Sequence, residues 1–337
     1  MSYERAQFSS RRSLLLSLPV IAAASTITAQ TRKRQIPLRT LNHATLTVAD
    51  VQRSTEFYQG LFGMPIQARQ GTLPSLRIGD GPQFIFLSGG SANSKPGINH
   101  LCVTTDHFDA EQILGIVAEH GFAKDDSGVM ASGPFKVHVR MRQGTAELSI
   151  GDPDGIIVQI QDTRYAGGAG RLGELVKIEP SPIKGLIAVR DLSHFTLDVS
   201  DGQRSVTFYQ HLFGMPIQGR QGSTPILAIG SHRQYLALLA EAPSRKPGIN
   251  HLCLTMENFN PDQVLKRLAG FGVKPRSDMR AAAGPLVSWF ILRKEDRGGD
   301  RDGTPELYFT DPDGITLQLQ DVQYCGGSGK LGEVCNG

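Results

Sequence analysis

The stretch Glu306-Leu-Tyr-Phe-Thr-Asp-Pro-Asp-Gly-Ile-Thr-Leu-Gln-Leu-Gln320 decides the fold of this chain. Two runs of strand-forming residues flank a Pro-Asp-Gly turn, which is a strong signal for a β-hairpin. Nearly the same hairpin occurs earlier, as Glu147-Leu-Ser-Ile-Gly-Asp-Pro-Asp-Gly-Ile-Ile-Val-Gln-Ile-Gln161. A hairpin that occurs twice in this form indicates a duplicated domain.

The duplication gives a repeat of about 150 residues, and each hairpin lies near the end of its copy. Three segments of the first copy recur 151 positions later, namely Leu41–Asp50, Phe57–Gln67 and Lys95–Cys102. At the hairpin the offset is 159, as between Asp152 and Asp311, so the second copy carries 159 − 151 = 8 extra residues. The polar run Arg293–Gly303 is the most plausible place for this insertion.

Each copy shows the order strand, helix and three strands, and then the same order again. Alternating apolar residues in His43–Val48 predict a half-buried strand. Asp50 and Asp109 stand where they can cap the two helices of the first copy, and Gly63 and Gly121 where they can end them. The fold class is therefore α+β, with each copy built from two βαβββ units.

The domain boundaries follow from these repeats and from composition. The predicted ranges are an export signal in 1–30, a first module in 38–165, a linker in 166–185, a second module in 186–324 and a C-terminal tail in 325–337.

The N-terminus has the pattern of a signal peptide. Arg11 and Arg12 precede an apolar run from Leu14 to about Ala24, and small residues suitable for cleavage follow. The paired arginines resemble a twin-arginine signal, and a general secretory signal or an uncleaved anchor is the alternative. The run is too short to span a bilayer as a permanent helix. We therefore expect an exported, periplasmic protein that has no membrane partner after the signal is removed.

The charge of the chain argues against a nucleic-acid or anionic-membrane partner. The net charge is +3, and the first 30 residues contribute three arginines and one glutamate, which leaves +3 − (3 − 1) = +1. Such a near-neutral protein has no electrostatic footprint for phosphates or lipid head groups. The expected partner is a small molecule.

The chain has four cysteines, in two different settings. Cys102 and Cys253 occupy equivalent places, each two residues after a histidine, and buried core thiols or extra soft ligands are both compatible with that position. Cys325 and Cys335 lie in the tail and can pair in an oxidising compartment.

The strand–helix order, the paired histidines and the Asp-Pro-Asp-Gly hairpin together resemble the vicinal oxygen chelate superfamily, which includes glyoxalase I, extradiol dioxygenases and bleomycin-resistance proteins. The resemblance covers Leu38–Tyr165 and Leu186–Tyr324. It implies a cupped, barrel-like mixed sheet in each module, with the ligand inside.

The resemblance also implies a set of three metal ligands in each module. The first set is His43, His100 and Gln159, and the second is His194, His251 and Gln318. Metal-using members have a Glu at the third position, whereas both copies here have a neutral Gln. Two histidines and a carboxylate suit non-haem Fe(II). We therefore expect Fe²⁺ first, with Mn²⁺ or Zn²⁺ as alternatives, and a metal-free protein as the remaining case.

Other residues near these positions bear on the chemistry. Tyr308 stands where ring-cleavage dioxygenases place a Tyr that faces the substrate, and the first module has Ser149 there. The resemblance therefore implies that the second module is the active one, although the dioxygenase His expected in 299–306 is missing.

Two kinds of charged residue are candidates for additional site residues. Simple hairpin pairing places Glu147 opposite residue 160, on the other face from Gln159. A bulge would reverse this, so Glu147 and Glu306 are reserve ligands. Three arginines of the first module can reach an anionic substrate, but the sequence does not show whether they point inward. They are Arg77, Arg140 and Arg142.

Two functions follow from these observations. The first is a metal-dependent enzyme, dioxygenase-like or glyoxalase-like, acting on a small substrate with vicinal oxygens. The alternative is a metal-free binding or sequestration protein similar to the bleomycin-resistance proteins.

Overall fold

The computed structural model describes residues 1, 33–90, 94–230, 233–240 and 245–335. Every described helix and strand lies in one compact unit, Lys33–Gly337. The predicted export signal lies outside the described residues and stays a prediction.

Each half of this unit contains one nine-stranded mixed sheet, as the repeat predicts. The first sheet has the order β2-β3-β4-β1-β5-β9-β8-β7-β6, and the second repeats this order as β11-β12-β13-β10-β14-β18-β17-β16-β15. The first sheet consists of β1 Leu41–Val48, β2 Ile66–Gln70, β3 Leu73–Arg77, β4 Phe84–Gly89, β5 Gly97–Thr105, β6 Ala123–Lys124, β7 Lys136–Arg142, β8 Thr145–Gly151 and β9 Ile157–Asp162. The second consists of β10 Leu192–Asp198, β11 Ile217–Gln221, β12 Thr224–Ala228, β13 Tyr235–Leu239, β14 Gly248–Met256, β15 Lys274–Pro275, β16 Val287–Arg293, β17 Thr304–Thr310 and β18 Thr316–Asp321. The short edge strands β6 and β15 were not predicted.

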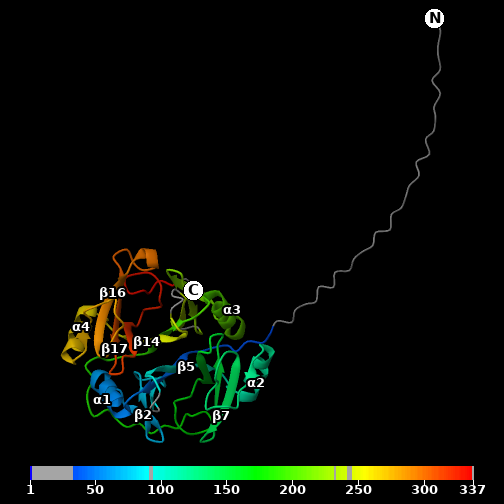
Figure 1. Cartoon of the computed structure of the whole chain (residues 1–337), viewed down its shortest axis with the longest axis horizontal. Coiled ribbons are helices and arrows are strands. Elements are labelled where there is room, and N and C mark those ends of the chain that lie inside the picture. Colours follow the sequence, from blue (N-terminus) through cyan, green and yellow to red (C-terminus); the bar gives the residue numbers. More distant parts are fainter. Residues whose placement is uncertain (2–32, 91–93, 231–232, 241–244, 336–337) are drawn as a thin grey trace. The chain divides into compact units, whose positions relative to one another are not determined.

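The four helices begin at side-chain caps, where a short polar residue accepts a hydrogen bond from a free backbone N–H. These helices are α1 Val51–Phe62, α2 Ala110–Glu119, α3 Gly202–Phe213 and α4 Pro261–Gly270. Asp50 caps α1 and Asp109 caps α2, both as predicted. Asp201 and Asn260 do the same in the second module. In Figure 1, α4 lies beside β16 and β17.

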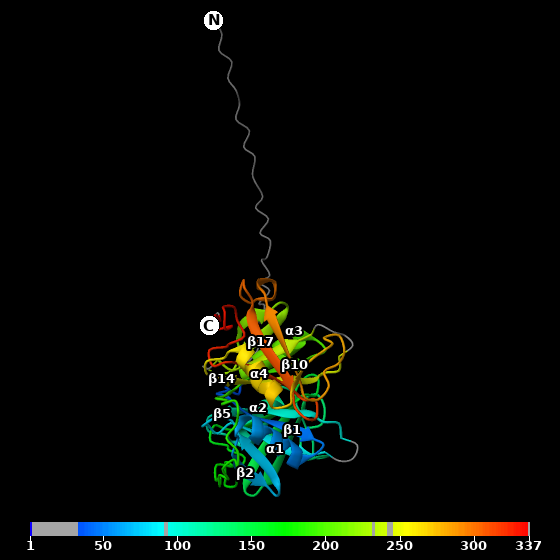
Figure 2. The same ribbon diagram turned by 90° about the vertical axis from the view of Figure 1, so that its left-hand side faces the viewer.

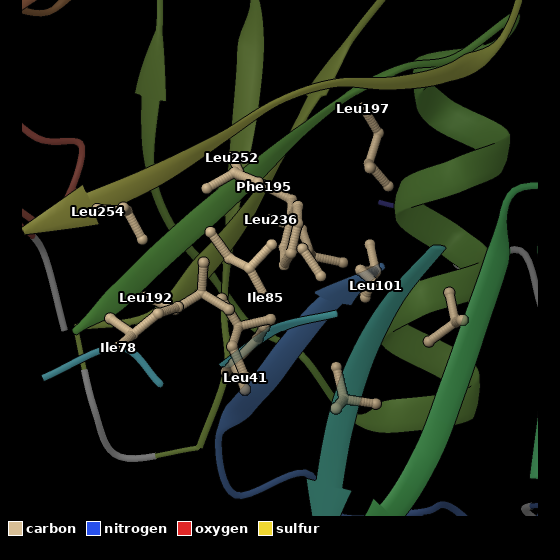
Figure 3. Close-up of a cluster of buried hydrophobic side chains, with 14 of the residues drawn as sticks. Leu41, Ile78, Ile85, Leu101, Leu192, Phe195, Leu197, Leu236, Leu252 and Leu254 are labelled. Carbon is tan, nitrogen blue, oxygen red and sulfur yellow. The ribbon is translucent and has the colours of Figure 1, made fainter. Parts of the chain in front are cut away.

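One hydrophobic core runs through both modules. Its residues include Leu41 and Leu101 of the first sheet together with Leu192 and Leu252 of the second, all fully buried. Figure 3 shows these side chains from the two sheets packed against one another. Because each β-strand alternates its faces, the opposite faces of the same strands are left to line the two cups.

The two hairpins have a register that differs by one residue from the predicted register. The loop closes between Asp152 and Ile156, whose backbone N–H···O distance is 2.9 Å, and Gly155 has a φ of +81°. This is a three-residue loop, in which a glycine takes up the left-handed conformation. Ser149 therefore pairs with Gln159, and the prediction that placed Glu147 on the face opposite Gln159 is wrong. Tyr308 pairs with Gln318 in the same way.

The contacts between the modules occur in reciprocal pairs. The Tyr58 hydroxyl on α1 donates to Asp311 in the second hairpin at 3.1 Å, and Tyr209 on α3 donates to Asp152 in the first at 3.0 Å. Next to each tyrosine is an ion pair, which joins Arg53 to Asp313 and Arg204 to Asp154. Figures 1 and 2 show α1 next to the second module. Each Asp-Pro-Asp-Gly turn thus docks on the first helix of the other module.

The starts of β1 and β10 are joined by two glutamines in the same reciprocal manner. The Gln234 amide accepts from the Leu41 N–H at 2.8 Å and donates to the Leu192 carbonyl at 2.7 Å. Gln83 accepts from the Leu192 N–H and donates to the Leu41 carbonyl, both at 2.9 Å. Each glutamine therefore satisfies backbone groups of both modules.

The tail is held by a disulfide between Cys325 and Cys335, while Cys102 and Cys253 are free and buried. Within the described part of the chain, no helix has both the length and the apolar character needed to cross a membrane.

Candidate functional site

Strand register places the predicted site residues in one row across the inner face of each sheet. In the second module the row runs through neighbouring partners in the order Ala228, Tyr235, His194, Cys253, Gln318, Tyr308 and Trp289. In the first module the same row is Arg77, Phe84, His43, Cys102, Gln159, Ser149 and His138. His251 and His100 lie on β14 and β5 beside these rows, opposite Thr196 and Thr45.

In the second module the three predicted ligands converge on one another. The Gln318 Oε1 atom lies 3.0 Å from His194 Nε2 and 3.1 Å from His251 Nε2. All three side chains are almost completely buried. Two imidazoles and an amide oxygen from three strands therefore meet around one point.

The protonation state of His251 follows from its neighbours. Asn250 donates its amide N–H to the Asp198 carboxylate at 2.8 Å, which leaves Asn250 Oδ1 as the acceptor that faces His251 Nδ1 at 2.8 Å. His251 must therefore carry its proton on Nδ1 and a lone pair on Nε2. The two atoms that face each other at 3.1 Å, His251 Nε2 and Gln318 Oε1, are then both acceptors. The Thr196 hydroxyl, 3.2 Å from Nε2, is the available donor there.

The other end of the Gln318 amide is unsatisfied. Its Nε2 is buried and has no hydrogen-bond partner among the described residues. A buried donor without a partner costs about 1–3 kcal/mol. The orientation that points the Gln318 oxygen toward the histidines therefore carries this cost in folding free energy. Between His251 and Gln318 two lone pairs face each other without a proton between them, which is the arrangement that a cation requires, and the trio fits a divalent metal.

The first module has the equivalent three residues, but the histidine whose tautomer is fixed is a different one. His100 Nε2 lies 3.0 Å from Gln159 Oε1. Here His43 is the imidazole whose tautomer is fixed, because Asn42 donates to the Tyr165 carbonyl at 2.9 Å and accepts from His43 Nδ1 at 2.8 Å. In the second module the residue at that place is Ser193, 3.2 Å from His194 Nδ1, and its hydroxyl can donate or accept.

Burial keeps all four histidines neutral near pH 7. It lowers the pKa of His100 and His251 to about 4, and it lowers the pKa of His43 and His194 well below the usual value. A neutral imidazole is the form that binds a metal. The burial of the set is therefore compatible with metal binding and excludes a role for these histidines as cations.

The surroundings of the two trios differ in character. In the second module Tyr308 stacks on Trp289, with ring centroids 5.4 Å apart and planes 11° apart, and contacts the edge of His251 at 5.4 Å. The Tyr308 hydroxyl donates to Glu306 at 3.1 Å, and burial raises the pKa of Tyr308 well above its usual value. Tyr308 therefore acts as a hydrogen-bond donor and an aromatic wall beside the site.

The reserve ligands Glu147 and Glu306 lie on the inner face but are occupied by other partners. Glu306 accepts from Arg293 at 2.7 Å and from the Tyr324 hydroxyl at 3.0 Å. Glu147 accepts from two arginines and from Tyr165. Among the residues that the structure describes, no third His, Cys, Asp or Glu joins either histidine pair.

A cavity of about 620 Å³ lies between the modules, beside the start of β10. Its lining includes Ser193 and Tyr324, whose ring centroid is 5.8 Å from that of His194, together with Gln83 and Gln234. None of the six predicted ligands lines it. The cavity thus reaches the residue behind His194 and not the point where the three donors meet.

Several residues around the site were not predicted, although the sequence carries a signal for some of them. Three of the four histidines follow an Asn directly, and Asn42 and Asn250 fix the tautomers. Trp289 was missed because nothing in the sequence sets the register of β16 against β17. Asn42 and Asn250 contact the predicted histidines that follow them in sequence, and Trp289 contacts Tyr308 from the next strand.

Comparison with solved structures shows where this fold is found. The Mn(II)-bound glyoxalase from Novosphingobium aromaticivorans matches with a TM-score of 0.57 and 15% identity over 84% of this chain and 82% of that chain. A catechol 2,3-dioxygenase matches with a TM-score of 0.58 and 12% identity over 88% and 89%. An extradiol ring-cleaving dioxygenase from B. fuscum matches with a TM-score of 0.55 and 14% identity over 86% and 73%. At these identities the likeness shows a shared fold.

Sequence comparison gives the family. No curated protein matches the chain in sequence. The sequence pattern of one family matches both modules, at residues 40–160 and 191–319, which is more than half of the chain. The chain therefore belongs to the Glyoxalase/Bleomycin resistance protein/Dioxygenase superfamily.

Proposed function

We propose that this protein is a divalent-metal-dependent enzyme whose reaction takes place in the second module. The observation that carries the proposal is the convergence of His194, His251 and Gln318 within 3.0–3.1 Å, with the lone pair of His251 Nε2 turned toward the Gln318 oxygen. These three residues would hold the metal. When bound, it would act as a Lewis acid and a template for a substrate with two adjacent oxygens.

The neutral donor set constrains the substrate. Two imidazoles and an amide leave the charge of a divalent cation uncompensated, whereas a carboxylate ligand would offset part of it. A substrate that binds through two oxygens, at least one of them ionised, would supply that compensation. We therefore propose a small anionic oxygen chelator as the substrate class.

The aromatic wall supports a planar substrate. The stacked rings of Trp289 and Tyr308 present a flat apolar surface beside His251. The Tyr308 hydroxyl donates its one proton to Glu306, which orients it, and its oxygen can accept a hydrogen bond from a substrate hydroxyl. Similarity to a catechol dioxygenase and a glyoxalase supports ring cleavage and glyoxalase-type isomerisation as the two reaction classes to test.

Metal analysis of the full chain purified without chelator tests the proposal. We expect Fe(II), Mn(II) or Zn(II) in the protein, and a rise in melting temperature when the metal is added back after removal. His194→Ala should abolish the effect of metal at the second module, and His43→Ala should leave it. The proposal is wrong if no metal copurifies and none of the three metals stabilises the protein.

A metal-free binding protein is the alternative, and the Gln side chains favour it. If the Gln318 amide is turned over, its N–H groups donate to both imidazole Nε2 atoms and close a network without a metal. This alternative predicts a ligand that stabilises the protein equally well in chelator. Turnover in a screen of catechols and dicarbonyl compounds would count against it.

A further inference from the structure

The inner face of the first module carries an excess of positive charge that the second module lacks. On β3 and β7 three arginines share the face of Gln159, and one glutamate, Glu147, faces them, which gives 3 − 1 = +2. At the matching places the second module has Ala228, Ile291 and Arg293 against Glu306, which gives 1 − 1 = 0. The sequence left open whether these arginines point inward, and the register settles that they do.

One arginine in each module has a structural role. Arg293 is fully buried and donates from Nε to Glu306, from Nη1 to the Gly298 carbonyl at 2.6 Å and from Nη2 to the Gly327 carbonyl at 2.9 Å. Its counterpart Arg142 makes the equivalent bond to Glu147. The pairs Arg142–Glu147 and Arg293–Glu306 occur in both modules and are part of the shared fold. Arg77 and Arg140 have no counterpart in the second module.

The guanidinium of Arg142 also has a donor that folding does not explain. Its Nη1 is buried and has no partner among the described residues. In the second module the matching atom is satisfied by Gly298, which belongs to the eight-residue insertion. In the first module only Gln143 and Gly144 connect β7 to β8, so no such carbonyl is present. An unpaired buried guanidinium N–H is costly, and a ligand oxygen would remove that cost.

The other two arginines belong to the same cup. Arg77 donates to Gln67 at 3.0 Å, and Gln67 donates to the Ala166 carbonyl at 2.9 Å. The next two carbonyls in the chain, those of Gly167 and Gly168, accept from Arg142 Nη2. Arg140 donates to Glu147 and keeps 35% of its side chain exposed, so solvent reaches this part of the cup.

We propose that the first module is a separate binding site for a small doubly charged oxyanion, such as a phosphate or a dicarboxylate. Arg142 Nη1 would donate to it, and Arg77 and Arg140 would supply the charge that a dianion neutralises. These arginines lie on β3 and β7, whereas the histidines of this module lie on β1 and β5. The site is independent of metal and of the reaction in the second module.

Calorimetric titration of the full chain in chelator tests this proposal, with inorganic phosphate in one arm and malonate in the other. We expect saturable binding of at least one anion, weakened by higher salt. The double variant R77A/R140I, which copies the second module, should weaken binding at least about tenfold. The double variant K266A/K274A, an equal loss of two charges at exposed positions of α4 and β15, is the matched control and should bind as the wild type does.

A charge-preserving variant separates binding from folding. Arg140→Lys should retain affinity within about threefold if charge is what matters, and circular dichroism should show the same fold for all variants. The arms also separate a phosphate ligand from a dicarboxylate ligand. The proposal is overturned if neither anion binds saturably up to about 10 mM, or if R77A/R140I binds as tightly as the wild type.

Discussion

At the scale of single residues, the proposed function makes Gln318 the residue that should control how strongly a metal is held. The amide supplies one oxygen and no charge, at a place where metal-using relatives of this fold are expected to have a carboxylate. Both modules have a Gln at this position, Gln159 and Gln318, so neither trio contains a charged ligand.

Gln318→Glu should therefore have opposite effects with and without metal. We expect Mn(II) affinity to rise at least about tenfold, because the carboxylate offsets the charge of the ion. In chelator the buried carboxylate should lower the free energy of unfolding by about 1–3 kcal/mol. Titration with Mn(II) followed by electron paramagnetic resonance, together with chemical denaturation, measures both effects.

Gln159→Glu is the matched control for this prediction. It makes the same change in the first module, where Arg140 and Arg142 surround the trio and would already attract the new carboxylate. We expect a smaller loss of stability in chelator there. Equal Mn(II) affinity of Gln318→Glu and the wild type would contradict the metal-ligand role of residue 318.

The tautomer of His251 gives a second prediction at this scale. Asn250→Asp would place a carboxylate beside His251 Nδ1 and next to the carboxylate of Asp198, its present partner. The repulsion between the two acids should weaken the anchor and lower metal affinity about 3–10-fold, as changes behind a ligand typically do. Asn99→Asp makes the equivalent change behind His100. An unchanged affinity for Asn250→Asp would show that the bond between Asn250 and Asp198 does not matter for metal binding.

At the scale of elements, the closing loop of each module has the same shape with and without a disulfide. In the tail, Ser328 and Val334 pair through two backbone hydrogen bonds, and Cys325 is bonded to Cys335. In the first module Ala169 and Leu175 pair in the same way, while Ala166 and Val176 stand where the cysteines would be. The loop geometry therefore does not require the disulfide.

Replacing both cysteines with serine should lower stability without unfolding the protein. Loop-entropy arguments give a loss of about 2–3 kcal/mol for a loop of this length. The melting temperature measured by calorimetry should fall, while the circular dichroism spectrum below the transition stays the same. A variant that is unfolded at 25 °C would show that this loop nucleates the second module.

The hairpin element shows where reasoning from sequence succeeded and where it stopped. Two copies of Asp-Pro-Asp-Gly fixed the order of strands and the duplication, because turn chemistry is local. The register was missed by one residue, because it depends on whether Gly155 joins the loop, and that choice placed Glu147 on the wrong face. The inward direction of Arg77 and Arg140 was not readable either, because it depends on the registers of β3 on β4 and of β7 on β8.

For the site as well, features encoded by local sequence could be predicted, and contacts that depend on strand register could not. The three ligand positions in each module were predictable from their places in a repeated pattern. The bond from Asn250 to Asp198, across 52 residues, depends on how β14 pairs with β10, and no local pattern encodes it. The stacking of Trp289 on Tyr308 likewise requires the register of β16 on β17.

At the scale of the whole molecule, two buried carboxylates link the modules. Asp152 and Asp311 each accept a hydrogen bond from a tyrosine of the other module. Burial raises the pKa of both aspartates to about 6. A folded-state pKa above the unfolded value means that the stabilising contribution is complete below about pH 4 and is lost as pH rises through 6.

Replacing both aspartates with asparagine, D152N/D311N, isolates this effect. The stability of the wild type minus that of the variant should fall as pH rises from about 4 to about 6 and then level off, by roughly 2–3 kcal/mol for each aspartate. The histidines cancel in this difference, because both proteins contain them. Urea denaturation between pH 4 and 8 measures it. A flat difference would mean that the aspartates do not titrate in this range.

The exchanged hairpin turns have a consequence for how such a chain can arise. The tyrosine–aspartate bonds, the arginine–aspartate ion pairs and the two glutamine bridges that join the halves each occur twice with the halves interchanged, which is the pattern of an isologous interface in a homodimer. The covalent connection between the halves is then a tether and not the source of their association. A circular permutant that begins in the second half and ends with the first would make the same contacts, and a single ancestral half would find them in a copy of itself.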